Sequence, residues 1–398
     1  MKKKLILATA AAALLTAPAM AQEDGIPVGI ILGFTGPLES IMPNMANSAE
    51  LAFSEASESG QLLGGRTIVP VRADSTCIDA AAAVAAAERL VTSDDVVAIM
   101  GADCSGVTTA VVNNVSVPNG VPTISPSATS PALTTIEDQG LFFRTAPSDA
   151  RQGEVIANVL DERGIEQIAV TYTNNDYGKG LADSFAAAFE ALGGSVLISA
   201  AHEDGRADYS AEVGALSAAG ADTLAVFGYA DGGGRGIVQA ALDTGAFEQF
   251  VFGDGMFGES VIEASGPELD GRVVGAVPGT ANDGAQMFVH LTEGTPVDPT
   301  GTYAGESYDA AALIVLAMQK AGSADRAAIA ANLMDVANAP GEAIGPGELG
   351  RALEIIAAGG DVDYGGATGV ELIGPGEASG SYRIFEIDGG ELVTIGFR

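Results

Sequence analysis

Two short apolar runs, at residues 96–100 and 121–124, constrain the fold more than any other part of the chain. Each has the length and β-branched content of a buried strand, and each ends in a loop rich in serine and threonine. A helical pattern over 106–115 separates the two runs. The order of strand, helix and strand predicts a βαβ unit, whose parallel strands end at the same edge of a sheet.

The hydroxyl side chains after these two strands are candidate ligand contacts. Ser105 lies in the first loop, and Ser127 and Thr129 lie in the second. Ligands of open α/β sheets bind outside the carboxyl ends of the strands, where a helix N-terminus also offers free N–H groups to an anion. The three residues are therefore placed to hold a small carboxylate. The same hydroxyls could serve only as helix caps and turn residues, and their spacing does not decide between the two readings.

The alternation of strands and helices extends over most of the chain and starts a second time near Ser148. The first series has strands at 26–34 and 67–73 and helices at 44–57 and 79–92, together with the unit above. The second has helices at 152–163, 181–192 and 210–219 and strands at 167–172, 195–200, 223–228, 250–252 and 272–277. This pattern predicts an α/β fold of two doubly wound units with a cleft between them.

The C-terminal third is expected to add helices at 308–321 and 327–337 and a β-hairpin. The hairpin strands are predicted at 382–387 and 391–396, with the turn at 388–390. A chain of this length is too long for one core, which agrees with two domains.

The N-terminus has the pattern of a signal peptide. Three lysines at 2–4 precede an apolar run to Leu15, and Ala19-Met20-Ala21 is an A-x-A cleavage site, so we predict a signal peptide over 1–21. No later apolar run reaches the roughly 18 uncharged residues that a spanning helix needs. Export and a soluble mature protein are the expectation.

The charge balance argues against several partners. The formal net charge is −34, and removal of the three signal-peptide lysines makes it −37. A phosphate backbone or an anionic membrane surface would repel such a chain, so nucleic-acid binding is not expected. The acidic residues are scattered without a run of five, which favours a role in solubility.

The chain contains two cysteines, Cys77 and Cys104. An exported protein meets an oxidising compartment, where a pair of cysteines favours a disulfide over free thiols. Each cysteine follows a predicted strand end, on either side of the helix at 79–92. A bridge would therefore tie one strand-to-helix connection to the Ser105 loop.

Several blocks of the sequence resemble the periplasmic branched-chain amino-acid binding proteins, which are leucine-binding-protein-like solute-binding subunits of ABC transporters. The blocks are Cys104-Ser105, the run at 124–131, Phe143-Arg144-Thr145 and the run at 175–182. The resemblance implies the type I periplasmic binding protein fold, in which two Rossmann-like lobes are joined by three crossovers. It divides the chain into lobe I, 22–147 and 278–378, and lobe II, 148–277 and 379–398. It also implies a periplasmic monomer that passes an amino acid or amide to an inner-membrane ABC permease.

The resemblance implies roles for the polar site residues. Ser105 matches the serine that holds the ligand carboxylate, and Thr129 matches a threonine that touches both ends of the amino acid. Ser127 stands where the family uses a backbone carbonyl to accept from the ammonium, so its side chain is incidental. Asp254 stands at the glutamate that pairs with the ammonium, and an aspartate is one methylene shorter. A plain turn is the other reading of Asp254.

The resemblance also implies the walls of the site. Tyr177 and Tyr229 match aromatics that close over the ligand, although each could be a tyrosine of a surface loop. Tyr303 is a further wall residue. Ile41 replaces an aromatic residue of the family, which makes that wall aliphatic and thinner. These residues do not identify one amino acid.

No pattern of an enzyme emerges. The run at 253–258 fits GxGxxG, but it lies deep in the chain rather than in the first strand-to-helix turn. No G-x-S-x-G motif exists, and the two histidines, His202 and His290, belong to different predicted lobes. We therefore expect no catalysis, no cofactor and no metal site. The alternative to transport is a protein of the same fold that binds an amide or carboxylate and signals through a receptor.

Overall fold

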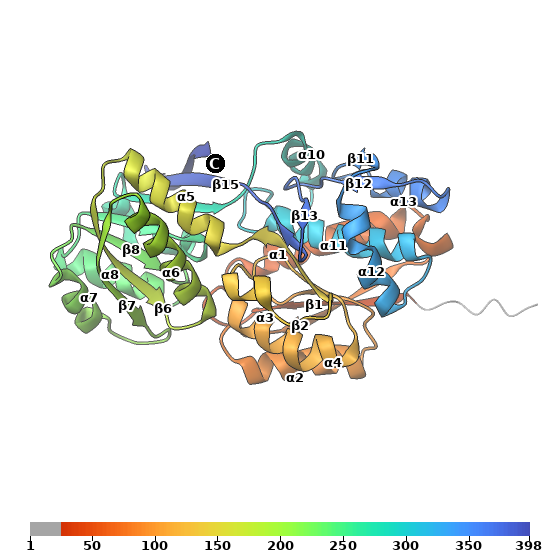
Figure 1. Cartoon of the computed structure of the whole chain (residues 1–398), viewed down its shortest axis with the longest axis horizontal. Helices are drawn as coiled ribbons and strands as arrows, with labels where there is room; N and C mark the ends of the chain where they lie inside the picture. Colours follow the sequence, from red (N-terminus) through yellow and green to blue (C-terminus); the bar gives the residue numbers. More distant parts are fainter. Residues whose placement is uncertain (1–24) are drawn as a thin grey trace, which may run out of the picture.

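The computed structural model of this chain describes residues 25–398, so the predicted signal peptide over 1–21 lies outside the described residues. Two seven-stranded sheets, each covered by helices, form two lobes that lie side by side (Figure 1). We call the part built on the first sheet lobe I and the part built on the second sheet lobe II. The predicted α/β fold with two doubly wound lobes is thereby confirmed.

The sheet of lobe I is parallel except at one edge. Its spatial order is β13 (Leu372–Ile373), β14 (Glu377–Ala378), β5 (Phe142–Pro147), β4 (Thr123–Ser125), β3 (Ile99–Gly101), β1 (Ile26–Leu32) and β2 (Ile68–Asp74). Only β13 runs antiparallel to its neighbour. The central strands are buried on both faces, which explains why their sequences are continuous apolar runs rather than alternating patterns.

The sheet of lobe II is parallel over five strands and ends in an antiparallel hairpin. Its spatial order is β16 (Glu391–Phe397), β15 (Tyr382–Asp388), β10 (Val273–Pro278), β9 (Gln249–Phe252), β8 (Thr223–Phe227), β6 (Gln167–Thr173) and β7 (Ser195–His202). The predicted hairpin is confirmed as β15 and β16.

The helices of lobe I cover both faces of its sheet. Figure 1 shows α1 (Met42–Glu58), α11 (Ala304–Ala321) and α12 (Arg326–Ala337) above the sheet and α2 (Ala80–Thr92) and α3 (Ser105–Val111) below it. The helix predicted at 106–115 is α3, continued by a π-helical turn at Val112–Ser116 and by α4 (Val117–Asn119).

The helices of lobe II follow from the strand order. Because β7 lies outside β6 and β8 lies inside it, right-handed crossovers place α6 (Asp176–Ala191) and α7 (Ser210–Ser217) on opposite faces. The other helices of this lobe are α5 (Asp149–Glu162), α8 (Gly233–Thr244) and α9 (Glu259–Ser265).

The chain passes between the two sheets three times, after β5, after β10 and after β14. These passages agree with a fold of two lobes and three crossovers. The numbered lobe boundaries of the sequence analysis stay a prediction.

Several elements differ from the sequence predictions. The strand β5 was not predicted, because the charged Arg144 interrupts its apolar run. The helix α6 begins at Asp176 rather than at Leu181, because the Asn175 side chain caps it by accepting from the Gly178 N–H at 3.0 Å. The remaining unpredicted elements are α10 (Asp283–Thr292), α13 (Leu349–Ala357), β11 (Glu342–Ile344) and β12 (Val362–Tyr364), in addition to α9, β13 and β14.

The predicted disulfide is present between Cys77 and Cys104, which follow β2 and β3.

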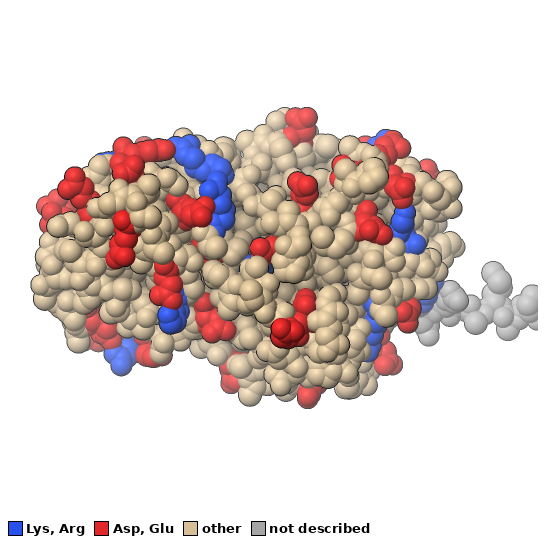
Figure 2. All heavy atoms as spheres, in the orientation of Figure 1, with Lys and Arg blue, Asp and Glu red and all other residues tan. Residues whose placement is uncertain are grey.

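No helix in the described part of the chain combines the length and the apolar character needed to cross a membrane. On the face shown in Figure 2, acidic side chains are spread over both lobes and basic ones lie among them.

Candidate functional site

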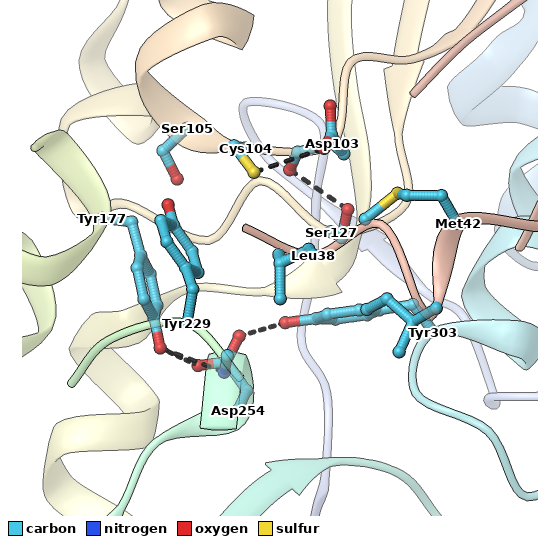
Figure 3. A pocket seen from close by; sticks show the side chains of 12 residues that line it. Leu38, Met42, Asp103, Cys104, Ser105, Ser127, Tyr177, Tyr229, Asp254 and Tyr303 are labelled. Carbon is cyan, nitrogen blue, oxygen red and sulfur yellow. Dashed lines mark hydrogen bonds between the residues drawn. The ribbon is translucent and has the colours of Figure 1, made fainter. Parts of the chain in front are cut away.

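A pocket lies where strand ends of the two lobes meet (Figure 3). The empty space between its lining residues, part of which is open to solvent, amounts to about 350 Å³. The lining residues follow β1, β3, β4, β6, β8 and β9 or precede α11: Leu38, Ile41, Met42, Asp103, Cys104, Ser105, Ser127, Tyr177, Tyr229, Asp254, Gly255 and Tyr303.

The structure brings together seven of the eight ligand-site residues that were predicted. They are Ile41, Ser105, Ser127, Tyr177, Tyr229, Asp254 and Tyr303. Thr129 is buried but does not line the pocket, and its carbonyl accepts from the Asp149 N–H at 2.8 Å. The ligand-binding roles of these residues stay predictions.

Asp254 is the carboxylate that both lobes approach. It begins a short 3₁₀ turn, Asp254–Met256, directly after β9, and only 3% of it is exposed. The Tyr177 hydroxyl donates to its Oδ1 at 2.8 Å, and the Tyr303 hydroxyl donates to its Oδ2. Burial raises the pKa of Asp254, and the hydrogen bonds from Tyr303 and Tyr177 offset part of this rise. The donors therefore favour the ionised carboxylate at this end of the pocket.

The backbone of Tyr303 is held in an unusual conformation. Its φ of 58° lies in the left-handed region, at the residue that precedes α11. A bulky residue held there costs about 1–3 kcal/mol, and such residues cluster at functional sites. In Figure 3 the Tyr303 side chain points from lobe I toward Asp254 of lobe II.

Two tyrosines of lobe II form an aromatic wall. The rings of Tyr177 and Tyr229 are stacked with their centroids 5.3 Å apart, and the Asn175 side chain donates to the Tyr229 hydroxyl at 3.0 Å. The Gly255 N–H donates to the Tyr177 hydroxyl at 3.1 Å. A Cβ on Gly255 would lie 2.5 Å from the Gly228 carbonyl oxygen, so this close approach requires glycine.

The opposite end of the pocket carries hydroxyl groups of lobe I. The Ser105 Oγ accepts from the Ser130 N–H at 3.1 Å, which leaves its own proton free to donate to a ligand. The Ser127 hydroxyl donates to the Asp103 carbonyl at 3.1 Å. The proton of the Ser127 hydroxyl is thus already engaged.

Asp103 is a lining residue that the sequence reasoning missed. Its carboxylate accepts from the Ser75 hydroxyl at 2.5 Å and so joins the loops after β2 and β3. Burial raises the pKa of Asp103, and the Ser75 hydrogen bond opposes that shift. An acid directly after a predicted strand end, in the Ser105 loop, was the signal that could have identified it.

The ionisable side chains that line the pocket are carboxylates and tyrosine hydroxyls. Its lining includes two carboxylates, and no Lys, Arg or His side chain of residues 25–398 is among the lining residues. A ligand with a cationic group would therefore be favoured at the Asp254 end.

Cys77, Asp103 and Cys104 lie close enough together to suggest a metal site, but the disulfide removes both thiolates as ligands.

Two known proteins are similar to this chain over most of its length. The chemotactic signal transduction system substrate-binding protein BasB of Halobacterium salinarum is 28% identical over 379 residues, which is 93% of this chain and 88% of that protein. The Leu/Ile/Val-binding protein BraC3 of Rhizobium johnstonii is 30% identical over 341 residues, which is 84% of this chain and 90% of that protein.

The same fold occurs in solved structures. The branched-chain amino acid transporter substrate binding protein LivJ of Streptococcus pneumoniae, in complex with isoleucine, has a TM-score of 0.76 at 23% identity. The match covers 94% of this chain and 99% of that chain. The sequence pattern of the periplasmic binding protein family matches residues 25–352. This chain therefore belongs to the periplasmic binding protein family.

Proposed function

We propose that this protein is the periplasmic solute-binding subunit of an ABC importer and that it captures a small, branched-chain type of amino acid between its lobes. The observation that carries the proposal is a single pocket with the Asp254 carboxylate at one end and the free Ser105 hydroxyl proton at the other. The Leu/Ile/Val-binding relative described above supports the ligand class.

The two ends of the pocket suit the two charges of an amino acid. A zwitterion loses its hydration on entering the pocket, and this loss is offset only when both charges gain partners. The ammonium would bind Asp254 in lobe II, and the carboxylate would bind Ser105 in lobe I. The ligand itself then joins the lobes, so binding stabilises the closed form.

Contacts between the lobes support a closed arrangement. The Asp231 carboxylate of lobe II accepts from the Ser40 N–H at 3.0 Å, and the Asp231 N–H donates to the Pro37 carbonyl at 3.1 Å. The Tyr303 to Asp254 hydrogen bond also joins the two lobes. These contacts lie beside the pocket and would form as the lobes approach each other.

An aliphatic ligand side chain has a matching wall. Leu38, Ile41 and Met42 line the pocket together at the start of α1. Burial of an aliphatic side chain against them contributes about 0.8 kcal/mol per CH₂ group.

The proposed function requires no catalysis and no cofactor. We further propose a monomer with the lobe boundaries given in the sequence analysis.

Signalling is the second candidate function, because one relative is a chemotactic signal transduction system substrate-binding protein. Ligand capture would be the same, and only the membrane partner would differ. Co-purification from the native membrane separates the two, since a permease and a receptor are distinct partners. An amide or carboxylate ligand would also fit this second function.

The ligand proposal is tested by a thermal-shift screen on refolded mature protein. Leucine, isoleucine or valine should raise the melting temperature, because a ligand at 100 times its Kd stabilises the folded state by about 2.7 kcal/mol. The matched compounds are 4-methylpentanoate, which is leucine without its amine, and isoamylamine, which is leucine without its carboxylate. Neither should stabilise the protein comparably. A shift with 4-methylpentanoate equal to that with leucine would contradict an ammonium site at Asp254.

Tyr177→Phe should weaken amino-acid binding by about tenfold, because Asp254 loses one of the two hydroxyl donors that orient its carboxylate and favour its charged form. Isothermal titration calorimetry measures the change in Kd. Tyr172→Phe is the matched control, since Tyr172 lies in β6 and does not line the pocket. Equal affinities for both variants would show that the Tyr177 hydroxyl does not support the site.

A further inference from the structure

The two stacked tyrosines of the pocket direct their hydroxyl groups to opposite ends of it. In Figure 3 the Tyr177 hydroxyl points at Asp254, whereas the Tyr229 hydroxyl points toward Ser105. Both tyrosines belong to lobe II and line the pocket. Tyr229 therefore brings a polar group of lobe II to the end of the pocket where lobe I supplies the Ser105 hydroxyl.

Asn175 holds the Tyr229 hydroxyl from behind the pocket. It is the N-cap residue of α6, and its Oδ1 accepts from the Gly178 N–H at 3.0 Å. A backbone N–H can only donate, so this contact fixes which end of the amide is the oxygen. The Nδ2 group is then the end that faces Tyr229, and it donates to the Tyr229 hydroxyl oxygen at 3.0 Å.

This hydrogen bond decides the direction in which the Tyr229 hydroxyl can donate. A phenol carries one proton and accepts through its oxygen, and here the oxygen accepts from the Asn175 amide. The proton must lie on another side of the oxygen, where it can donate to a group in the pocket. Burial raises the pKa of Tyr229 well above its usual range, so the hydroxyl keeps this proton at neutral pH.

Ser105 has the same arrangement on the facing lobe. Its Oγ accepts from the Ser130 N–H and keeps its own proton for a ligand. The Tyr177 hydroxyl differs, because its proton is already donated to Asp254. The Ser105 end of the pocket thus offers two hydroxyl protons, one from each lobe. Two donors that approach from two sides suit the two oxygens of a carboxylate.

The residue type at position 175 matters for this arrangement. Asp, Ser and Thr cap helices about as well as Asn. Among these residues only Asn carries an acceptor oxygen and an NH₂ donor on separate atoms, so it caps α6 and donates to Tyr229 at the same time. An aspartate would keep the cap, but it would accept from the Tyr229 hydroxyl and turn that proton away from the pocket.

We propose that Tyr229 donates to the carboxylate of the bound amino acid and that Asn175, which does not line the pocket, is the positioning residue that sets Tyr229 as a donor. Asn175 thereby makes the site prefer a carboxylate over a carboxamide, because an amide would set its NH₂ group against one of the two hydroxyl protons. The inference rests on the proposed function, since it needs a ligand whose carboxylate lies at the Ser105 end.

The test compares leucine with leucinamide, in which a neutral amide replaces the carboxylate. Isothermal titration calorimetry at about pH 6.5 keeps the amines of both compounds charged. The wild type should bind leucine at least about tenfold more tightly than leucinamide. Tyr229→Phe should lower this preference by about tenfold, because the carboxylate loses one donor. Asn175→Asp should lower it at least as much, because the Tyr229 oxygen would then face the pocket and accept from the amide.

The matched control is Asn282→Asp. Asn282 caps α10 by accepting from the Ala285 N–H at 2.8 Å, and it does not line the pocket. The same substitution at this N-cap should leave the preference for leucine at the wild-type value. Asn175→Ser keeps a capping hydroxyl without the NH₂ donor and adds no charge. It should lower the preference by a smaller factor, and it carries the test if Asn175→Asp does not fold.

A double variant separates the hydroxyl from the added negative charge. If Asn175 acts through Tyr229, Asn175→Asp should change the preference little in a Tyr229→Phe background. A fall of the same size in that background would assign the effect to charge repulsion and overturn the role of Asn175. An unchanged preference in both Asn175 variants would overturn it as well.

The outcomes distinguish this inference from the proposed function. If the wild type binds leucine but Tyr229→Phe keeps the full preference over leucinamide, the role of Tyr229 is wrong while the proposed function stands. Equal binding of leucine and leucinamide by the wild type has the same meaning. If no branched-chain amino acid binds the wild type, both proposals are wrong.

Discussion

Asp254→Asn should raise the Kd for a branched-chain amino acid by about 100-fold or more while leaving the fold intact. The amide keeps the shape of the side chain but removes the negative charge that faces the ligand ammonium. The amide presents an NH₂ donor in place of one carboxylate oxygen, so Tyr177 or Tyr303 can no longer donate to that atom. Loss of one member of a buried, hydrogen-bonded charge pair costs about 2–5 kcal/mol. Isothermal titration calorimetry at neutral pH gives the affinity.

The control for this variant is Asp183→Asn, in the same lobe. Asp183 is an exposed residue of α6 that pairs with Lys179 and does not line the pocket. Its affinity should equal that of the wild type. Melting curves without ligand check that both variants are folded. An unchanged Kd in Asp254→Asn would remove Asp254 from the binding site and leave the ammonium proposal without its partner.

Removal of the disulfide should have the second large effect, on stability. The bond closes a loop with a sequence separation of 27 residues. In the chain-entropy description, a loop of this length lowers the entropy of the unfolded state enough to stabilise the fold by about 3.5 kcal/mol. The double variant Cys77→Ala, Cys104→Ala should lose this amount in urea unfolding. Far-UV circular dichroism is the suitable signal, because the chain has no tryptophan.

The reducing agent supplies the internal control for the disulfide. Reductant should lower the stability of the wild type to nearly that of the double variant and should leave the double variant unchanged. The cysteines are 2% and 5% exposed, so unfolding under reducing conditions gives full access to the bond. Equal stability of wild type and double variant would show that the bridge contributes nothing, and the loops after β2 and β3 would then be held by Asp103 and Ser75 alone.

Most strands and helices were predictable because their signals are local. Strands such as β6 and β8 are short apolar runs, and the helices between them show helical periodicity. The strand β5 escaped prediction because Arg144 stands in its centre. That charge is buried through an ion pair with Glu377, which lies 233 residues away in the chain. No local pattern reports such a partner.

The site was predictable in part. Ser105 and Ser127 follow strand ends, where open α/β sheets bind ligands, and they line the pocket. Asp254 and Tyr303 were named from the family resemblance, and the spacing of residues did not indicate that they touch. Their contact spans 49 residues and crosses from one lobe to the other. Leu38 and Met42 were missed because nothing in their sequence neighbourhood marks a site, and Asp103 was missed although it follows a predicted strand end in the Ser105 loop.

The sequence by itself determined the α/β class, the two doubly wound lobes and the strand ends at which a ligand would bind. Those features follow from hydrophobic periodicity and from the parallel geometry of βαβ units. Only the tertiary structure decided that Tyr177 of lobe II and Tyr303 of lobe I converge on Asp254. The reason is physical, because the burial and protonation of a carboxylate depend on groups that chain folding brings together from distant positions.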